Sequence, residues 1–262
     1  MYANKRVSFR PEHSEEKAFL TLSNAKGSIP LYMQVKDLLV ARVTKGEWTP
    51  GDIIPSEIQL ARDLKVSQGT VRKAITELVE NNVLLRQQGR GTFVATHDGN
   101  RALFHFFHIV NDNGTKTLPE CKTLSCRRKS ATSEQASILN LSRGHQVICI
   151  ERIRYLDSKA TIIEKIILPS GLFQGLEKPQ ATDLPNTLYE LYESRYGITI
   201  HRAEEQLRAV TATNRDASLL GLAAGTPLLE IKRTALTLDG TPVELRISRC
   251  STSRHHYQNT VL

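Results

Sequence analysis

Arg152 and Arg154 are the two side chains of this sequence whose spacing most clearly indicates a binding site. They lie in a predicted strand, Glu151-Arg152-Ile153-Arg154-Tyr155, and strand residues separated by two share a face. Two parallel guanidinium groups can hold a phosphate or a carboxylate through paired hydrogen bonds. Glu164 and Glu244 lie in later predicted strands and can accept hydrogen bonds from hydroxyl or amino groups of the same ligand. The alternative is a solvated ladder of cross-strand salt bridges.

Thr187 begins a predicted helix over Leu188–Tyr196. The N-terminus of a helix attracts anions through its free N–H groups. The sequence therefore predicts that a small anionic molecule binds between the arginine strand and this helix.

A second group of polar side chains lies on the first turns of a predicted helix that starts at Ser67 and stops at Asn81-Asn82. These residues are Ser67, Gln68, Gly69, Thr70, Arg72 and Lys73. Gln68 can bond adenine, Arg72 can bond guanine or a phosphate, and Thr70 can reach a backbone oxygen or a thymine methyl group. Gly69 would let the helix approach a partner closely. The alternative is an ordinary amphipathic helix with a solvated face.

The elements around this helix are those that a DNA-reading helix needs. Ser56 is a suitable cap for a helix that ends near Lys65, so two short helices meet at a turn of about three residues, as in a helix-turn-helix. Leu31 begins an earlier helix, which Gly46 closes. Apolar residues on both sides of the loop Gln88-Gly89-Arg90 predict a β-hairpin. A hairpin tip of this composition can enter a minor groove or bind phosphates.

Composition agrees with a nucleic-acid partner and gives no sign of a metal. The chain has 262 residues, enough for two domains, and a net charge of +8. Its four cysteines form no zinc-ligand pattern, so free thiols are expected. His105 and His108 flank Phe106-Phe107 in an apolar strand and are expected to pack rather than bind metal. The sequence also lacks an apolar signal segment or membrane span, and we expect a cytoplasmic protein with no cofactor.

The second half contains a repeat at an offset of 81 residues, in which Ala136–Leu141 matches Ala217–Leu222 and Arg152 matches Arg233. Each copy predicts a short helix followed by two strands, with turns at Asp157-Ser158 and Asp239-Gly240. Two such units predict one antiparallel sheet with helices against it, which makes an α+β domain.

Residues 30–95 resemble the DNA-binding domain of the GntR family. The resemblance depends on Pro30-Leu31-Tyr32, Pro50-Gly51, Ile54-Pro55-Ser56-Glu57, Leu60-Ala61, Val66-Ser67, Thr70–Ala74 and Gln88–Val94. It implies a winged helix-turn-helix and adds Ser56, Glu57 and Thr92 to the residues expected at DNA. The family usually has arginine at the positions of Ile58 and Gln68, and these arginines commonly read guanine. We therefore expect an operator richer in A·T pairs, contacted through Gln68.

Residues 100–252 resemble the UTRA domain of the HutC subfamily. The resemblance depends on Glu151–Asp157, Glu164 before Leu168-Pro169, Thr187-Leu188-Tyr189 and Gly240–Glu244. It implies a chorismate-lyase-like α+β fold that binds a phosphorylated sugar or a carboxylate. The effector residues expected from the residues and the resemblance together are Arg152, Arg154, Glu164, Thr187, Tyr189 and Glu244.

Together these inferences predict a homodimeric transcription regulator with two domains, which binds near-palindromic double-stranded DNA. The resemblance implies a repressor, because repression is the commoner behaviour in the family. The predicted boundaries are a tail at 1–27, the winged helix-turn-helix at 28–95, a linker at 96–101, the effector domain at 102–254 and a tail at 255–262. An enzyme on the second fold and a purely architectural DNA binder are the alternatives, although no catalytic motif is present.

Overall fold

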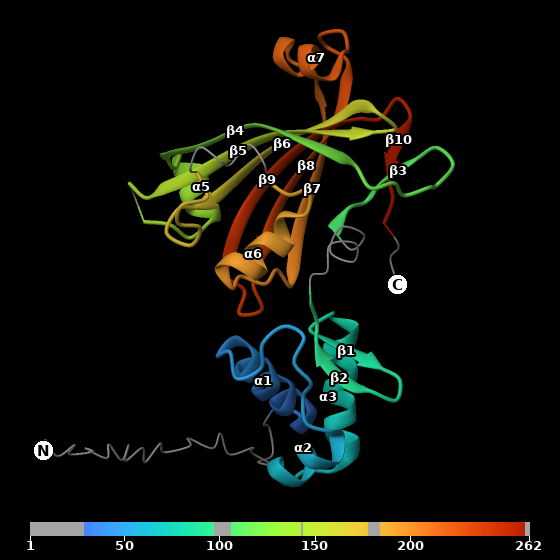
Figure 1. Cartoon of the computed structure of the whole chain (residues 1–262), viewed down its shortest axis with the longest axis vertical. Helices are drawn as coiled ribbons and strands as arrows, with labels where there is room; N and C mark the ends of the chain where they lie inside the picture. Colours follow the sequence, from blue (N-terminus) through green and yellow to red (C-terminus); the bar gives the residue numbers. More distant parts are fainter. Residues whose placement is uncertain (1–28, 97–105, 143, 178–183, 260–262) are drawn as a thin grey trace, which may run out of the picture.

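The computed structural model describes residues 29–96, 106–142, 144–177 and 184–259. The predicted N-terminal tail lies outside these residues, as does nearly all of the predicted linker. The chain forms a smaller N-terminal domain of helices with a hairpin and a larger C-terminal domain built on a sheet (Figure 1). None of the helices in the described ranges has the length and apolar character needed to span a bilayer.

The N-terminal domain contains three helices and a two-stranded sheet. The helices are α1 (Leu31–Thr44), α2 (Glu57–Leu64) and α3 (Gln68–Glu80), and the strands are β1 (Leu84–Gln87) and β2 (Gly91–Val94). An apolar core joins them, with Val35 and Leu39 from α1, Leu60 from α2, and Val71 and Ile75 from α3. The order of a helix-turn-helix followed by a hairpin confirms the prediction for this part of the chain.

Capping side chains set the ends of α2 and α3. The Ser56 hydroxyl accepts a hydrogen bond from the Gln59 backbone N–H, and the Gln59 side chain accepts one from the Ser56 N–H, so α2 starts with a capping box. Lys65, with φ of 53°, ends α2 in the left-handed region. Ser67 then caps α3 by accepting a hydrogen bond from the Thr70 N–H at 3.1 Å. The two predicted caps are confirmed.

The hairpin that follows α3 depends on a glycine. Gly91 has φ of 120°, and a Cβ atom there would lie 2.9 Å from Cδ1 of Ile53. Ile53 also forms an isolated bridge to Phe93, which ties the α1–α2 connection to the hairpin. The hairpin is therefore held against the domain and presents its tip, Gln88–Arg90, to solvent.

The C-terminal domain is an antiparallel six-stranded sheet with the order β4-β5-β6-β9-β8-β7. Its strands are β4 (Glu120–Ser130), β5 (Gln146–Leu156), β6 (Lys159–Pro169), β7 (Arg202–Thr211), β8 (Pro227–Leu236) and β9 (Pro242–Ser251). The helices α5 (Ser133–Ile138) and α7 (Asn214–Leu220) precede the hairpins β5–β6 and β8–β9. This arrangement confirms the repeat and the α+β class, and the positive φ angles of Asp157, Ser158 and Gly240 confirm the two tight turns.

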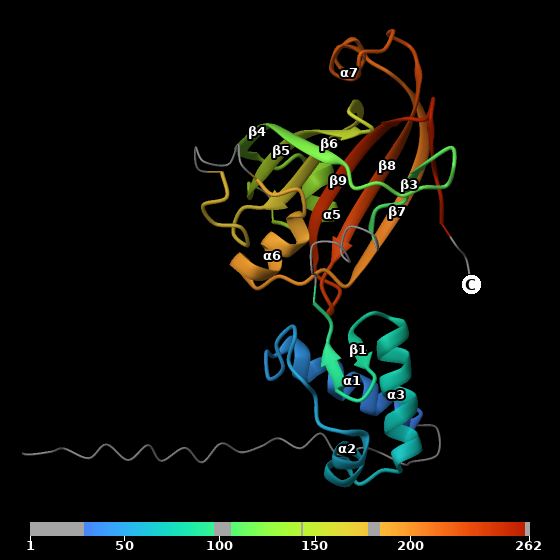
Figure 2. The same cartoon turned by 45° about the vertical axis from the view of Figure 1, so that its right-hand side comes forward.

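Helix α6 (Leu188–Tyr196) covers one face of the strongly twisted sheet (Figures 1 and 2), with the bounds that the sequence predicts. Tyr189 and Tyr192 of α6 pack with Phe173, Ile148 and Ile166 in the main apolar core.

Two predictions about the ends of this domain were wrong. The predicted C-terminal tail starts at residue 255, but His255–Tyr257 form strand β10, which pairs with β3 (Ile109–Asn111). His255 is buried accordingly. The apolar strand expected around Phe106-Phe107 begins only at Ile109, while His105 lies outside the described residues. The β3–β10 pairing escaped sequence reasoning because it joins segments far apart in the chain.

Candidate functional site

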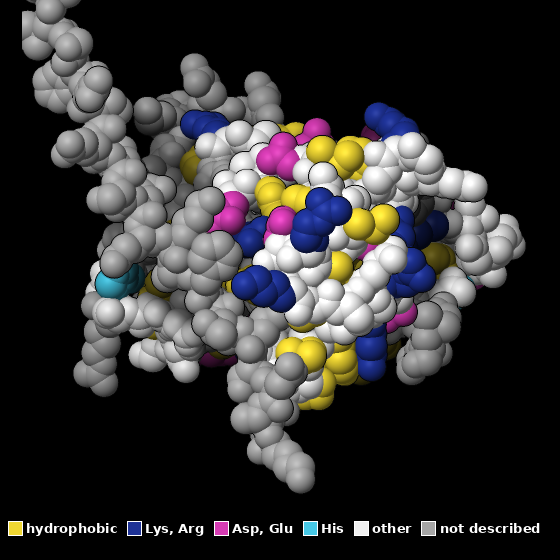
Figure 3. Space-filling model, turned by 90° about the horizontal axis from the view of Figure 1, so that it is seen from below, with side chains coloured by type: hydrophobic (Ala, Val, Ile, Leu, Met, Phe, Trp, Pro, Cys, Tyr) yellow, Lys and Arg dark blue, Asp and Glu magenta, His cyan; other side chains and the backbone are white. Residues whose placement is uncertain are grey.

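The exposed face of α3 carries the polar residues predicted to contact DNA. Gln68, Gly69, Arg72 and Lys73 are exposed, whereas the apolar stripe of the helix is buried. Thr70 is half-buried, and its hydroxyl lies 2.8 Å from Ser67 Oγ. Seen from this end of the molecule, basic side chains are spread over the surface, and apolar ones lie among them (Figure 3).

Glu57 organises this face. Its carboxylate accepts hydrogen bonds from Arg72 Nε at 2.9 Å, from Arg86 Nη2 at 2.9 Å and from Gln68 Nε2 at 3.5 Å. Glu57 therefore joins the starts of α2 and α3 to strand β1. Arg86 was absent from the predicted DNA-contacting set. Its position in β1, the strand that leads into the hairpin tip, was a signal that could have identified it.

The remaining residues predicted at DNA lie in two places. Ser56 is exposed at the cap of α2. Gln88, Gly89 and Arg90 form the exposed hairpin tip, and Thr92 is half-buried in β2. The predicted set thus lies on the starts of α2 and α3 and on the hairpin.

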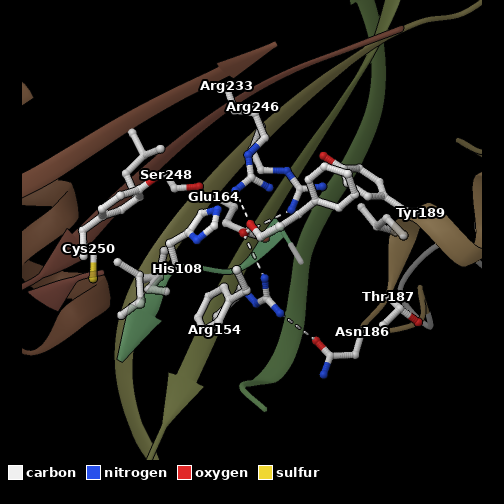
Figure 4. Close-up of a pocket in the computed structure, with 17 residues that line it drawn as sticks. His108, Arg154, Glu164, Asn186, Thr187, Tyr189, Arg233, Arg246, Ser248 and Cys250 are labelled. Atoms are coloured by element: carbon white, nitrogen blue, oxygen red, sulfur yellow. Dashed lines mark hydrogen bonds and ion pairs between the residues drawn. The ribbon is translucent and has the colours of Figure 1, made fainter. Parts of the chain in front are cut away.

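A cavity in the C-terminal domain is lined by four of the six residues predicted to bind an effector. These four are Arg154, Glu164, Thr187 and Tyr189, and they line it together with Arg233, Arg246, Asn186, Ser248 and His108. Figure 4 shows Arg154, Glu164 and Arg246 directed toward one another, with Asn186 and Thr187 at the start of α6. The rest of the wall is mostly apolar and includes Phe106, Phe107, Ile162, Ile231 and Tyr257.

Arg246 pairs with two carboxylates, those of Glu244 and Glu164. Its Nε and Nη2 each donate to one oxygen of Glu244 at 2.9 Å, and its Nη1 donates to Glu164 at 3.4 Å. Burial opposes the charge of Arg246, but these carboxylates raise its pKa well above the usual value.

Arg154 has one hydrogen-bond donor, its Nε, that no described residue uses. It donates to Glu164 Oε1 and to Asn186 Oδ1, both at 3.3 Å, and its guanidinium carbon lies 4.9 Å from the centre of the Phe107 ring. Its Nε, like Oε2 of Glu164, has no hydrogen-bond partner among the described residues. Burial lowers the pKa of Arg154. A buried donor without a partner is costly, so Arg154 is suited to bind an acceptor that enters the cavity.

Glu164 is ionised by its neighbours. Burial alone would raise its pKa, but Arg154, Arg246 and Arg152 outweigh burial and lower the pKa to about 2.

Two of the predicted effector residues do not line the cavity. Arg152 is fully buried behind it and donates to Cys121 Sγ at 2.7 Å and to the Asn186 carbonyl at 3.0 Å. Glu244 is also fully buried, and its oxygens accept from Arg246, Tyr189 and Tyr192. Both residues hold the residues that line the cavity rather than facing it.

The sequence contained signals for two of the arginines that it did not assign. Arg233 occupies the position of Arg152 in the second repeat, and Arg246 lies two residues after Glu244 on the same strand face. No local signal marked Asn186, whose side chain donates to the Pro119 carbonyl at 2.6 Å across 67 residues of chain.

The arginine cluster, defined as Arg152, Arg154, Arg233 and Arg246, exceeds its carboxylates in charge. The carboxylates in contact with it are Glu164, Glu244 and Glu205, the last bound to Arg233 Nε at 2.6 Å. Among the described residues, one positive charge of this largely buried cluster is left without a carboxylate of its own. Burying a charge without a partner is unfavourable, so the site is suited to an anion.

The cysteines and the possible metal ligands were two further features of the sequence. All four cysteines are free thiols, as predicted. Within the described ranges, His, Cys, Asp and Glu side chains form no group able to hold a metal ion.

Comparison with known proteins agrees with both halves of the molecule. Residues 31–94 match the bacterial regulatory proteins of the gntR family, and residues 116–256 match the UTRA domain. The chain is a GntR-family regulator with a UTRA domain. It is 30% identical over 222 residues to the transcriptional repressor NagR of Bacillus subtilis, covering 84% of this chain and 90% of that protein.

Further relatives support the same assignment to the HutC type. The histidine utilization repressor of Pseudomonas putida is 27% identical and covers 82% of this chain and 85% of its own length. The ligand-binding domain of a GntR-family regulator from Bordetella bronchiseptica superposes with a TM-score of 0.55 at 35% identity, over 60% of this chain and 97% of that domain. These relatives are regulators of transcription, so the chain is a DNA-binding transcription regulator.

Proposed function

We propose that this GntR-family protein is a homodimeric, cytoplasmic repressor whose affinity for a near-palindromic operator is controlled by a small anion bound in the UTRA domain. The observation that carries the proposal is the arginine cluster, with its excess positive charge and the unpaired Arg154 Nε at a cavity. A phosphorylated sugar or a carboxylate would bring negative charge and acceptor oxygens to Arg154 and the other arginines of the cluster.

On the DNA side, α3 is proposed to enter the major groove while the hairpin tip contacts the neighbouring minor groove or backbone. The exposed Gln68, Arg72 and Lys73 support this role, as does the exposed tip Gln88–Arg90. Two copies of the chain would place two such units on the two halves of a palindrome.

A connection between the two domains supports the proposed control. Arg233 lies on β8 and Arg246 on β9, and the turn between these strands carries Leu238, which packs against the core of the N-terminal domain. The free volume of the cavity is about 50 Å³, whereas ligand pockets commonly measure about 300 Å³ or more. A ligand would therefore have to displace the walls, including β8 and β9. Different ligand affinity in two domain arrangements is what population-shift control requires.

The proposal is tested in two steps with the full-length chain. First, genomic DNA fragments retained by the protein are sequenced, and their affinity is measured as a function of salt. We expect discrete fragments with inverted repeats and an affinity that falls as salt rises, because phosphate contacts release counterions. Binding that is undetectable or insensitive to salt would contradict the DNA-binding half.

Second, the thermal stability of the protein is measured with a panel of phosphorylated sugars and small carboxylates. A bound ligand raises the melting temperature by mass action. We expect stabilisation by a member of one of these classes, without turnover. Turnover of the ligand would favour an enzyme, and the lack of any stabilising anion would favour an architectural DNA binder.

A further inference from the structure

Ile58 is the most exposed large apolar side chain in the described part of the chain, at 60%. It lies in the first turn of α2, between the polar residues Glu57 and Gln59. A single exposed isoleucine is ordinary on a protein surface, so exposure alone indicates no role. Its place relative to α3 is what points to one.

Glu57 and Gln59 fix the turn that carries Ile58. Glu57 bonds Gln68 and Arg72 of α3, and Gln59 closes the capping box with Ser56. With both neighbours held, Ile58 is directed to solvent directly beside the residue that contacts Gln68 and Arg72. Ile58 is therefore an exposed apolar side chain next in sequence to the residue that joins α2 to Gln68 and Arg72 of α3.

In the major groove, the base edges offer one apolar group that such a side chain can contact, the C5-methyl group of thymine. In the major groove each base pair presents hydrogen-bond donors and acceptors, and thymine alone adds a methyl group. Isoleucine offers no hydrogen bond, so it favours thymine over the other bases.

We propose that Ile58 contacts the C5-methyl group of a thymine in each operator half-site, next to the base pair contacted by Gln68. This inference rests on the proposed function, because it requires operator-bound protein. Gln68 would select adenine and Ile58 thymine, so the two side chains together favour neighbouring A·T pairs. Glu57 is a positioning residue, which holds Gln68 and Arg72 for this contact.

The test measures the affinity of the full chain for operator duplexes in which one thymine at a time is replaced by deoxyuridine. Uracil keeps the base pair and lacks only the methyl group. For the wild-type chain we expect one position in each half-site at which this change lowers affinity about fourfold, as expected for one lost methyl contact. The Ile58→Ala variant should bind thymine and uracil duplexes equally at that position.

Ile53→Ala is the matched control. Ile53 is 57% exposed in the same domain, but it lies against Gly91 of the hairpin. We expect this variant to keep the fourfold difference at the same position, whatever its overall affinity. Ile58→Arg should shift the preference at that base pair toward guanine, because arginine bonds guanine in pairs of hydrogen bonds.

Two results would overturn the proposal while leaving operator binding intact. One is the absence of any thymine whose methyl group matters to the wild-type chain, and the other is an equal uracil effect in Ile58→Ala and wild type. If the wild-type chain bound no operator sequence at all, the proposed function would fail first and this inference with it. Affinity for the unmodified duplex distinguishes these cases.

Discussion

At the scale of residues, the UTRA domain contains several charged side chains that are buried in its sheet. Arg152, Arg154, Glu164 and Glu244 are each 3% exposed or less. Buried charges are tolerated only when they are paired, and removing one partner leaves the others buried without an opposite charge. Mutual pairing makes the cluster a structural part of the sheet, and under the proposed function it is also the site that an anion reorganises.

The Glu164→Gln substitution tests this coupling. Because the folded-state pKa of Glu164 is about 2, below the ordinary value of 4.5, its ionised form stabilises the fold above about pH 4.5. That contribution is lost as the pH falls from about 4.5 toward 2. We expect Glu164→Gln to lower the free energy of unfolding by about 3 kcal/mol at pH 7 and by clearly less at pH 3, measured by urea denaturation with circular dichroism.

Glu204→Gln is the control for that measurement. Glu204 pairs with Arg202 on β7, where both side chains are more than 60% exposed, and exposed pairs contribute little. We expect nearly wild-type stability. A Glu164→Gln variant as stable as wild type at pH 7, or equally destabilised at both pH values, would contradict the account of the cluster.

Sequence reasoning reached the residues whose role depends on strand alternation or on the start of a helix. Arg154, Glu164 and Thr187 follow from such local rules and line the cavity. His108 and Tyr257 could not be found in this way, because the packing of β3 and β10 places them at the cavity. Residues that serve the site through long-range contacts leave no local pattern.

At the scale of elements, the N-terminal domain follows closely from local rules. Serine caps, apolar stripes and a glycine-containing hairpin predicted α2, α3 and the hairpin, because each of these signals acts within a few residues. In the UTRA domain the two repeats and α6 were predicted for the same reason. The strand order β4-β5-β6-β9-β8-β7 was beyond prediction, since it depends on pairing between distant segments.

Removal of the α3 cap tests how far this helix depends on its first turn. Ser67→Ala removes the hydroxyl that accepts from the Thr70 N–H and leaves that N–H only the Ser67 carbonyl; loss of a serine cap costs about 1 kcal/mol. We expect a decrease of that size in the stability of the N-terminal domain. Urea unfolding can be followed by the fluorescence of Trp48, the only tryptophan, which packs against this core.

Ser67→Thr keeps a hydroxyl at the same position and should lose less than half as much stability. If the alanine and threonine variants unfolded at the same urea concentration, the hydroxyl would have no capping role.

At the scale of the whole molecule, the turn between β8 and β9 lies between the strands of the arginine cluster and the core of the N-terminal domain. Leu238 at this turn is half-buried and packs against the N-terminal core. The strands that end at the turn carry Arg233 and Arg246. A change at the arginine cluster therefore has a short physical route to the domain that binds DNA.

The Leu238→Ser substitution separates sensing from response. It removes the apolar contact and leaves the cavity residues in place. We expect the anion to raise the melting temperature of this variant as in wild type, while its effect on operator affinity falls at least about fivefold, within the usual range of coupling between sites. An unchanged effect on operator affinity would show that the signal travels by another route.

The affinity of the full chain for its operator, with and without a saturating anion from the thermal-stability panel, tests the central claim most directly. We predict that the anion weakens wild-type binding by about tenfold or more. Arg154→Met should bind the operator as wild type does without the anion and should not respond to it. Equal wild-type affinity in both conditions, or an Arg154→Met variant that responds like wild type, would contradict control of DNA binding through the arginine cluster.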